Sequence, residues 1–139
     1  MTLQEQFKTC FNELAPEYTK IELNQERIWN CRQERLKLEE DLKVAEYTLL
    51  DANCAKIDKL TYKIQVYALQ INIQIEIIAG NIRGLLVANG YNVTRNTPVA
   101  WNVVQDIKTL VDREDISEKK FQDGLKYITN KWIQSEQKA

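Results

Sequence analysis

The sequence predicts an all-α protein: a long helical hairpin or coiled coil that forms an oligomeric helical bundle, with a C-terminal pair of shorter helices. Three observations support this prediction. Only 4 Gly and 2 Pro occur in 139 residues, too few for the frequent turns of an all-β fold. Apolar residues make up 44% of the chain, enough for a modest core. They recur at helical or seven-residue spacing over most of its length.

The first segment, residues 1–15, is expected to form a short helix. Thr2 and Glu5 have the spacing of a capping box, in which each side chain accepts a hydrogen bond from the other residue's backbone. Pro16 then interrupts the helix or restarts it, because proline fits only the first turn of a helix. The apolar side of this helix consists of Phe7, Cys10, Phe11 and Leu14.

Residues 16–90 are expected to form the long helical core, since they contain no Pro beyond Pro16 and no Gly before Gly80. A seven-residue repeat in the first half predicts a coiled-coil seam, which Asn24 and Arg35 interrupt with polar groups. The seam consists of Ile21, Ile28, Leu42 and Leu49, with Cys31, Leu38, Ala45 and Ala52 three residues further on.

The seven-residue count slips by one position near Asp51–Cys54. One interpretation is a reversal at Asp51, which would cap the second of two helices at about 17–50 and 54–88. The other is a continuous coiled coil that absorbs the slip as a local change of supercoil. We favour the hairpin because its arms are equal in length, although no Gly or Pro marks the turn.

Residues 63–88 are apolar on two opposite helix faces, and a surface helix needs only one such face. The segment should therefore lie between two partners, and self-association is the simplest source of the second. The second face holds Val66, Leu69, Ile73, Ile77, Gly80, Gly84 and Val87. The predicted oligomer interface consists of Ile64, Ile71, Ile75, Ile78, Ile82 and Leu85, with Gly80 and Gly84 allowing close approach.

A β-strand and a membrane span are two other interpretations of this stretch. Residues 69–77 alternate between apolar and polar side chains, as a β-strand does, but the helical pattern extends beyond them on both sides. Residues 64–82 carry one formal charge, Glu76, and would be long enough to span a membrane. Their glutamines and asparagines would make such a span costly, so we expect no membrane insertion.

Residues 97–136 are expected to form an antiparallel pair of helices. Thr97 followed by Pro98 would begin the first helix, and Asp115 with Glu118 would cap the second. The apolar positions are Ala100, Val103, Val104, Ile107, Leu110 and Val111 in the first, and Phe121, Leu125, Ile128 and Trp132 in the second.

Composition argues against catalysis. The chain has no His, so it lacks the commonest general base and metal ligand, and no phosphate-binding or hydrolase motif occurs. Its 3 Cys show no metal-ligand spacing, and its N-terminus lacks a secretory signal, which together predict packed thiols in the cytoplasm. We therefore expect no enzyme activity, no cofactor and no metal.

The primary hypothesis is a homo-oligomeric, non-enzymatic interaction protein that acts as an adaptor, assembly factor or inhibitor by docking a helix face on another protein. Its partner-binding candidates are Trp29, Trp101 and Trp132. The alternative is a nucleic-acid-binding regulatory protein, despite a net charge of -1, that uses Arg27, Arg32, Arg35, Lys119, Lys120 and Lys126. A weaker alternative is a ligand-sequestering bundle with a cavity lined by Gln65, Asn72, Glu76 and Arg83. The spacing leaves open whether the dimer is parallel or antiparallel.

Overall fold

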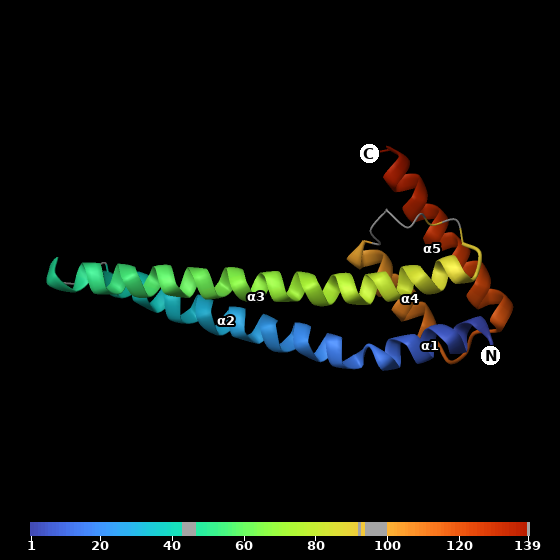
Figure 1. Cartoon of the computed structure of the whole chain (residues 1–139), viewed down its shortest axis with the longest axis horizontal. Coiled ribbons are helices and arrows are strands. Elements are labelled where there is room, and N and C mark those ends of the chain that lie inside the picture. The colour runs from blue at the N-terminus through green and yellow to red at the C-terminus, as the bar shows by residue number, and fades with distance from the viewer. Residues whose placement is uncertain (43–46, 92, 94–99, 139) are drawn as a thin grey trace. The chain divides into compact units, whose positions relative to one another are not determined.

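A computed structural model describes residues 1–42, 47–91, 93 and 100–138, which form helices and contain no strand (Figure 1). The all-α prediction is confirmed, and the alternative of a strand over residues 69–77 is wrong, because these residues lie inside one long helix. The helices are α1 (Leu3–Glu13), α2 (Ala15–Leu42), α3 (Tyr47–Ala88), α4 (Trp101–Val111) and α5 (Glu118–Lys138).

The chain divides into two compact units. The hairpin unit is Tyr18–Gln74 and contains most of α2 and the first part of α3. The terminal unit combines Met1–Glu17 with Ile75–Ala139, so it contains α1, the last turns of α3, α4 and α5.

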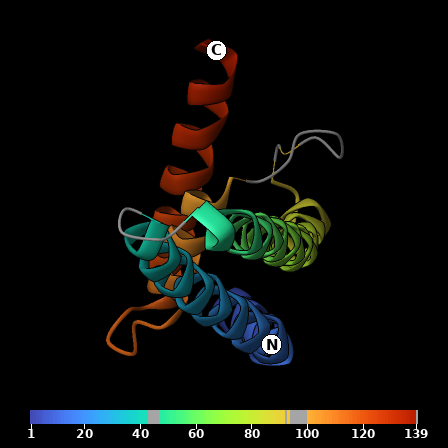
Figure 2. The same cartoon turned by 90° about the vertical axis from the view of Figure 1, so that its left-hand side faces the viewer.

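In the hairpin unit, α3 pairs with α2, and the two helices run in opposite directions (Figures 1 and 2). The Arg27 guanidinium lies 5.7 Å from the centre of the Tyr67 ring. Further along α2, Arg35 Nη1 donates a hydrogen bond to Thr61 Oγ1 at 3.3 Å. The residue numbers rise along α2 as they fall along α3, so the chain folds back and the hairpin interpretation is correct.

The predicted reversal at Asp51 is wrong, because α3 already begins at Tyr47 and Asp51–Cys54 lie within it. Helix α2 ends at Leu42, and α3 begins at Tyr47. The slip in the seven-residue count arises because Leu49 belongs to α3 and the preceding members of the count belong to α2. The count therefore joins positions from two different helices. The absence of Gly and Pro at residues 51–54 is consistent with their helical conformation.

The contact between α2 and α3 follows a seven-residue repeat on both helices. On each helix the repeated positions are buried or half-buried, as expected where two apolar stripes meet. They are Ile21, Asn24, Ile28, Cys31, Arg35, Leu38 and Leu42 on α2, and Ile57, Leu60, Ile64, Tyr67, Ile71 and Gln74 on α3.

The terminal unit begins with the predicted capping box. Thr2 Oγ1 accepts a hydrogen bond from the Glu5 amide, and the Glu5 carboxylate accepts one from the Thr2 amide, each at 3.2 Å. Phe7 and Phe11 are buried on the inner side of α1. Pro16 lies in the first turn of α2, directly after α1 ends, so of the two alternatives left open by the sequence it restarts the helix.

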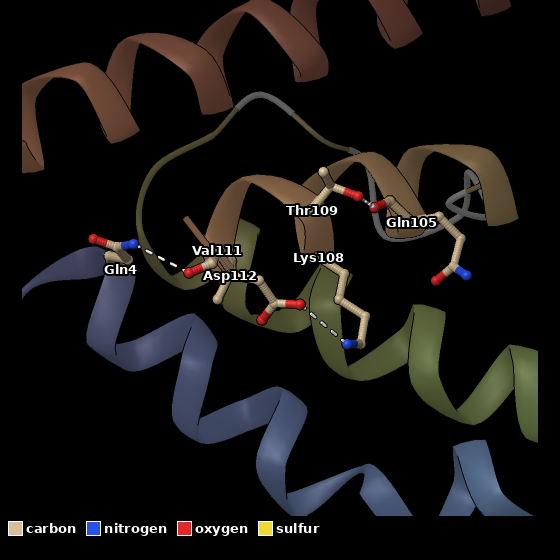
Figure 3. A network of polar contacts seen from close by, with 6 residues as sticks. All are labelled: Gln4, Gln105, Lys108, Thr109, Val111 and Asp112. Atoms are coloured by element: carbon tan, nitrogen blue, oxygen red, sulfur yellow. Dashed lines mark hydrogen bonds and ion pairs between the residues drawn. The ribbon is translucent and has the colours of Figure 1, made fainter. Parts of the chain in front are cut away.

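Helices α1, α4 and α5 enclose the core of the terminal unit. The centres of the Phe7 and Phe121 rings lie 6.2 Å apart, and this contact joins α1 to α5. A Cβ atom at Gly124 would lie 3.0 Å from Leu110 Cδ2, so glycine lets α5 approach α4 closely. Figure 3 shows Gln4 Nε2 donating to the Val111 carbonyl oxygen at 3.1 Å, which links the start of α1 to the end of α4.

The starts of α4 and α5 differ from the prediction. Helix α4 begins at Trp101 without a side-chain cap, while Thr97 and Pro98 lie outside the described residues. Ser117, not Asp115, caps α5: Ser117 Oγ accepts from the Lys120 amide at 3.3 Å. Glu118 instead accepts a hydrogen bond from the Leu3 amide at 2.8 Å. A carboxylate is stabilised there because the first amides of a helix carry partial positive charge.

Replacing Phe121 by Ala should destabilise the protein by about 3–5 kcal/mol, because the ring is fully buried between α1 and α5. Urea unfolding followed by circular dichroism measures the change. Tyr127→Ala on the same helix is the control, since this side chain is 69% exposed and its loss should cost less than about 0.5 kcal/mol. Equal effects of the two substitutions would contradict the described core.

Candidate interaction surface on the helical hairpin

Helix α3 carries apolar side chains on the side opposite its contact with α2. Tyr62, Leu69 and Ile73 are 66%, 62% and 54% exposed, and Val66 between them is half-buried. Their spacing of four, three and four residues places them on one side of the helix. We call these four residues the outer face of α3. It is the part of the predicted second apolar face that belongs to the hairpin unit.

The hairpin unit buries few of its own side chains. Among its described residues, those below a tenth exposed are Ile21, Asn24, Ile28 and Leu60. Two helices form one contact, and a stable helical layer normally needs a second layer to cover its remaining apolar face. Burying one exposed Leu or Ile side chain contributes about 1.5–3 kcal/mol. Covering the outer face would therefore contribute several kcal/mol to the free energy of binding.

Four of the eight residues of the predicted oligomer interface pack within the chain. Ile78 and Ile82 are fully buried in the terminal unit. Ile64 and Ile71 are half-buried at the positions that face α2. These four residues of the predicted interface therefore pack against helices of the same chain. The other positions are half-buried or exposed: Ile75, Gly80 and Leu85 are half-buried, and Gly84 is exposed.

The last part of α3 retains an open strip beside α1 within the terminal unit. A Cβ atom at Gly80 or Gly84 would meet nothing within 4 Å. A shallow groove runs along this strip and is lined from α1 by Gln6, Thr9, Cys10 and Glu13. The small residues there would allow another backbone to approach closely.

The three tryptophans have different environments. Trp29 is 61% exposed on α2, and Leu36, seven residues further along, is 50% exposed on the same side of that helix. Trp101 is half-buried at the start of α4, and Trp132 is 6% exposed. The Trp132 indole N–H is buried and has no hydrogen-bond partner among the described residues. Of the three partner-binding candidates, Trp29 is therefore the most accessible.

Two of the basic candidates are held within the hairpin. Arg27 stacks over Tyr67, and Arg35 contacts both Thr61 and Glu39, the latter at 3.9 Å. Arg27 is nevertheless exposed, as are the remaining candidates: Arg32 on α2, and Lys119, Lys120 and Lys126 on α5. The α5 lysines alternate with Glu118 and Asp123, so this helix presents both signs of charge.

The polar residues proposed to line a ligand cavity lie on the surface. Gln65, Asn72 and Glu76 are exposed, and Arg83 is half-buried with an interaction of its own. This arrangement leaves the first three open to solvent, which differs from the enclosed, largely apolar pocket that a small molecule usually occupies.

Asn24 is a polar residue within the contact between α2 and α3. It is 4% exposed, and its Oδ1 accepts a hydrogen bond from Arg27 Nη1 at 3.4 Å. A polar group at such a position lowers stability but selects one alignment of the helices. Gln74, another residue of this contact, has a buried Oε1 without a hydrogen-bond partner in the described part of the chain.

By length and composition alone, Asp51–Ala88 could cross a membrane, although 22% of its most apolar window is buried in the protein. One helix of this kind is weak evidence, because core helices of soluble proteins meet the same criteria. Among the described residues of this helix, Leu69 and Ile73 are more than half exposed.

Replacing Asn24 by Leu should stabilise the hairpin by about 1–2 kcal/mol, because a buried polar side chain is exchanged for an apolar one of similar size. The urea midpoint should rise. Gln33→Leu, at an exposed position of α2, is the control and should change stability by less than about 0.5 kcal/mol. A lower midpoint for Asn24→Leu would show that its bond to Arg27 outweighs the cost of burial.

The cysteines should differ in reactivity. Burial, with a smaller contribution from Glu13, raises the pKa of the Cys10 thiol, so less of it is thiolate at pH 8. Cys54 is exposed. Iodoacetamide should therefore modify Cys54 several-fold faster than Cys10, with the Cys10 rate still rising above pH 9. Mass spectrometry of peptides from a time course measures both rates, and equal rates at pH 8 would refute the difference in environment.

The described residues contain no group of three or more Cys, Asp or Glu side chains that could hold a metal ion. An open pocket within the terminal unit is lined mainly by polar residues from the start of α1, the end of α3 and α5. Comparison with protein-family models, curated proteins and solved structures finds no match for this chain.

Proposed function

We propose that this protein is a non-enzymatic helical interaction protein that self-associates through the outer face of α3. The observation that carries the proposal is the row of exposed apolar residues on this face, with Leu69 62% and Ile73 54% exposed. Scattered exposed apolar residues are common on soluble proteins, but a continuous row on one helix side is typical of an interaction surface.

A second copy of the hairpin is the surface that fits best. The opposite side of α3 is occupied by α2, whose exposed positions are largely charged, with Trp29 and Leu36 as exposed apolar residues among them. Pairing two outer faces would give the order α2, α3, α3, α2 across the dimer. Each α3 would then be covered on both of its apolar sides, which is what its composition requires.

A lipid bilayer is a less suitable partner for the outer face than a second copy of the hairpin. Gln65, Gln70 and Asn72 flank it, and their amide groups would lack hydrogen-bond partners in hydrocarbon. At a protein interface the same amides can pair with one another or with water. The charged residues of α2 would also have to remain close to the membrane while their helix stays paired with α3.

The exposed side of α2 is the surface that we assign to a protein partner. Trp29 and Leu36 provide two apolar anchors seven residues apart, and Trp is enriched among residues that dominate binding energy. The acids Glu22 and Glu26 precede them, and Glu39 and Glu40 follow. A partner helix with a central apolar patch and basic ends would match this pattern. An adaptor, assembly factor or inhibitor would act through such docking.

Nucleic-acid binding is the second candidate that the exposed basic residues leave open, and it is the weaker one. Arg27 and Arg35 are engaged within the hairpin, and acids lie next to the lysines of α5. Binding driven by phosphate contacts would decline steeply with salt concentration, which distinguishes it from apolar docking.

The purified chain should be a dimer or larger by light scattering after gel filtration. Replacing both Leu69 and Ile73 by Glu should shift it to a monomer, because four like charges would face one another across each interface. Gln33→Glu on α2 and Trp29→Ala should leave the mass unchanged. Circular dichroism checks that all variants remain helical.

A wild-type chain that is monomeric at concentrations of about 100 μM would overturn the proposal, since several kcal/mol of apolar burial should give binding in this range. Flotation of the wild-type chain with neutral phosphatidylcholine vesicles, lost in the Leu69→Glu, Ile73→Glu variant, would assign the same face to a membrane and would also overturn it.

A further inference from the structure

We infer that the two α3 helices of the dimer run antiparallel, with Lys59 of each copy against the partner's Glu76. The inference rests on the proposed self-association and specifies its geometry. Lys59 and Glu76 are both exposed, and α3 is one continuous helix that contains them. They lie at the two ends of the outer face and continue its spacing.

The outer face with these two ends is a six-position row. The positions are separated by three, four, three, four and three residues, the spacing at which one helix meets another along a seam. The row reads Lys59, Tyr62, Val66, Leu69, Ile73 and Glu76. Its four central members are apolar, and its two ends carry opposite charges.

An antiparallel arrangement matches this row with a second copy of itself. Val66 would lie against the partner's Leu69, and Tyr62 against the partner's Ile73, so that apolar residues meet throughout the centre. The same alignment brings each Lys59 to the partner's Glu76. A two-fold axis between Val66 and Leu69 relates the two copies, as a closed, self-complementary dimer requires.

A parallel arrangement would place like charges together at both ends. Lys59 would lie beside the partner's Lys59, and Glu76 beside the partner's Glu76, while each apolar residue would meet its own equivalent. Like charges in direct contact disfavour an arrangement even when the apolar contacts are similar. Of the positions that flank the row, Gln65, Gln70 and Asn72 are uncharged, whereas Asp58 and Lys63 lie beside its Lys59 end. A parallel dimer could pair Asp58 with the partner's Lys63, but this attraction would only offset the repulsion at the two ends. The antiparallel alignment has two attractive end contacts and no repulsive one. The charged ends therefore decide the orientation.

Charge reversal tests the orientation directly. We would measure the dissociation constant of the dimer by sedimentation equilibrium for Lys59→Glu, Glu76→Lys and the double variant. Each single substitution replaces two attractive contacts by two repulsive ones and should weaken the dimer about tenfold at low salt. The double variant restores both contacts with reversed polarity and should return the constant to within about twofold of wild type. Lys37→Glu, an equal change of charge at an exposed position of α2, should have no effect.

The outcomes separate the orientation from the self-association. A parallel dimer predicts no change in either single variant, because one like-charge pair merely replaces another, and that result would overturn the antiparallel inference while leaving self-association intact. A double variant weaker than both single variants would overturn it as well. A wild-type chain that does not dimerise would overturn both.

A disulfide test gives an independent result. In a background with Cys10, Cys31 and Cys54 replaced by Ser, a chain carrying Val66→Cys would be mixed with one carrying Leu69→Cys and oxidised. The antiparallel dimer predicts that the mixed pair crosslinks at least several-fold faster than either chain with itself. Faster crosslinking of Val66→Cys with itself would instead support the parallel arrangement and contradict the inference.

Discussion

The need to cover α3 on two sides is the constraint on which the rest of this structure depends. A helix of 42 residues with apolar side chains on opposite faces cannot be stabilised by one neighbour. Helix α2 covers one face of its first part through a seven-residue repeat. In the terminal unit, Ile78, Ile82 and Leu86 of α3 are fully buried. The outer face around Leu69 is left without a covering element from its own unit.

The polar residues of the hairpin determine alignment more than strength. Asn24 and Arg35 occupy positions in the contact between α2 and α3 where apolar residues would give more stability. Arg35 donates to Thr61 on α3, so sliding one helix along the other would break this hydrogen bond, whereas Asn24 is bonded to Arg27 on its own helix. The charged ends of the outer face would act in the same way in the dimer. In both cases apolar burial supplies the stability, and polar groups select one arrangement.

The positions of the charged and exposed apolar side chains in this protein are consistent with a role in binding other proteins. Acids and bases are distributed along exposed helix surfaces, and the lone acid of the apolar stretch, Glu76, is exposed at the end of the outer face. The exposed apolar groups, in contrast, gather on two helix sides, around Leu69 on α3 and around Trp29 on α2. Surfaces of this kind bind other helices, and the two sides can act at the same time because they belong to different helices.

The sequence by itself determined the helical class, the capping box at Thr2 and the two apolar faces of α3, because these depend on spacing and on backbone preferences of neighbouring residues. It identified the outer face but assigned the oligomer interface mainly to the other stripe. Only the tertiary structure decided which face the chain keeps for itself, where the chain reverses, and that Ser117 replaces Asp115 as a cap. These features depend on which helices meet, and a periodic pattern shows that a face must be buried without showing what buries it.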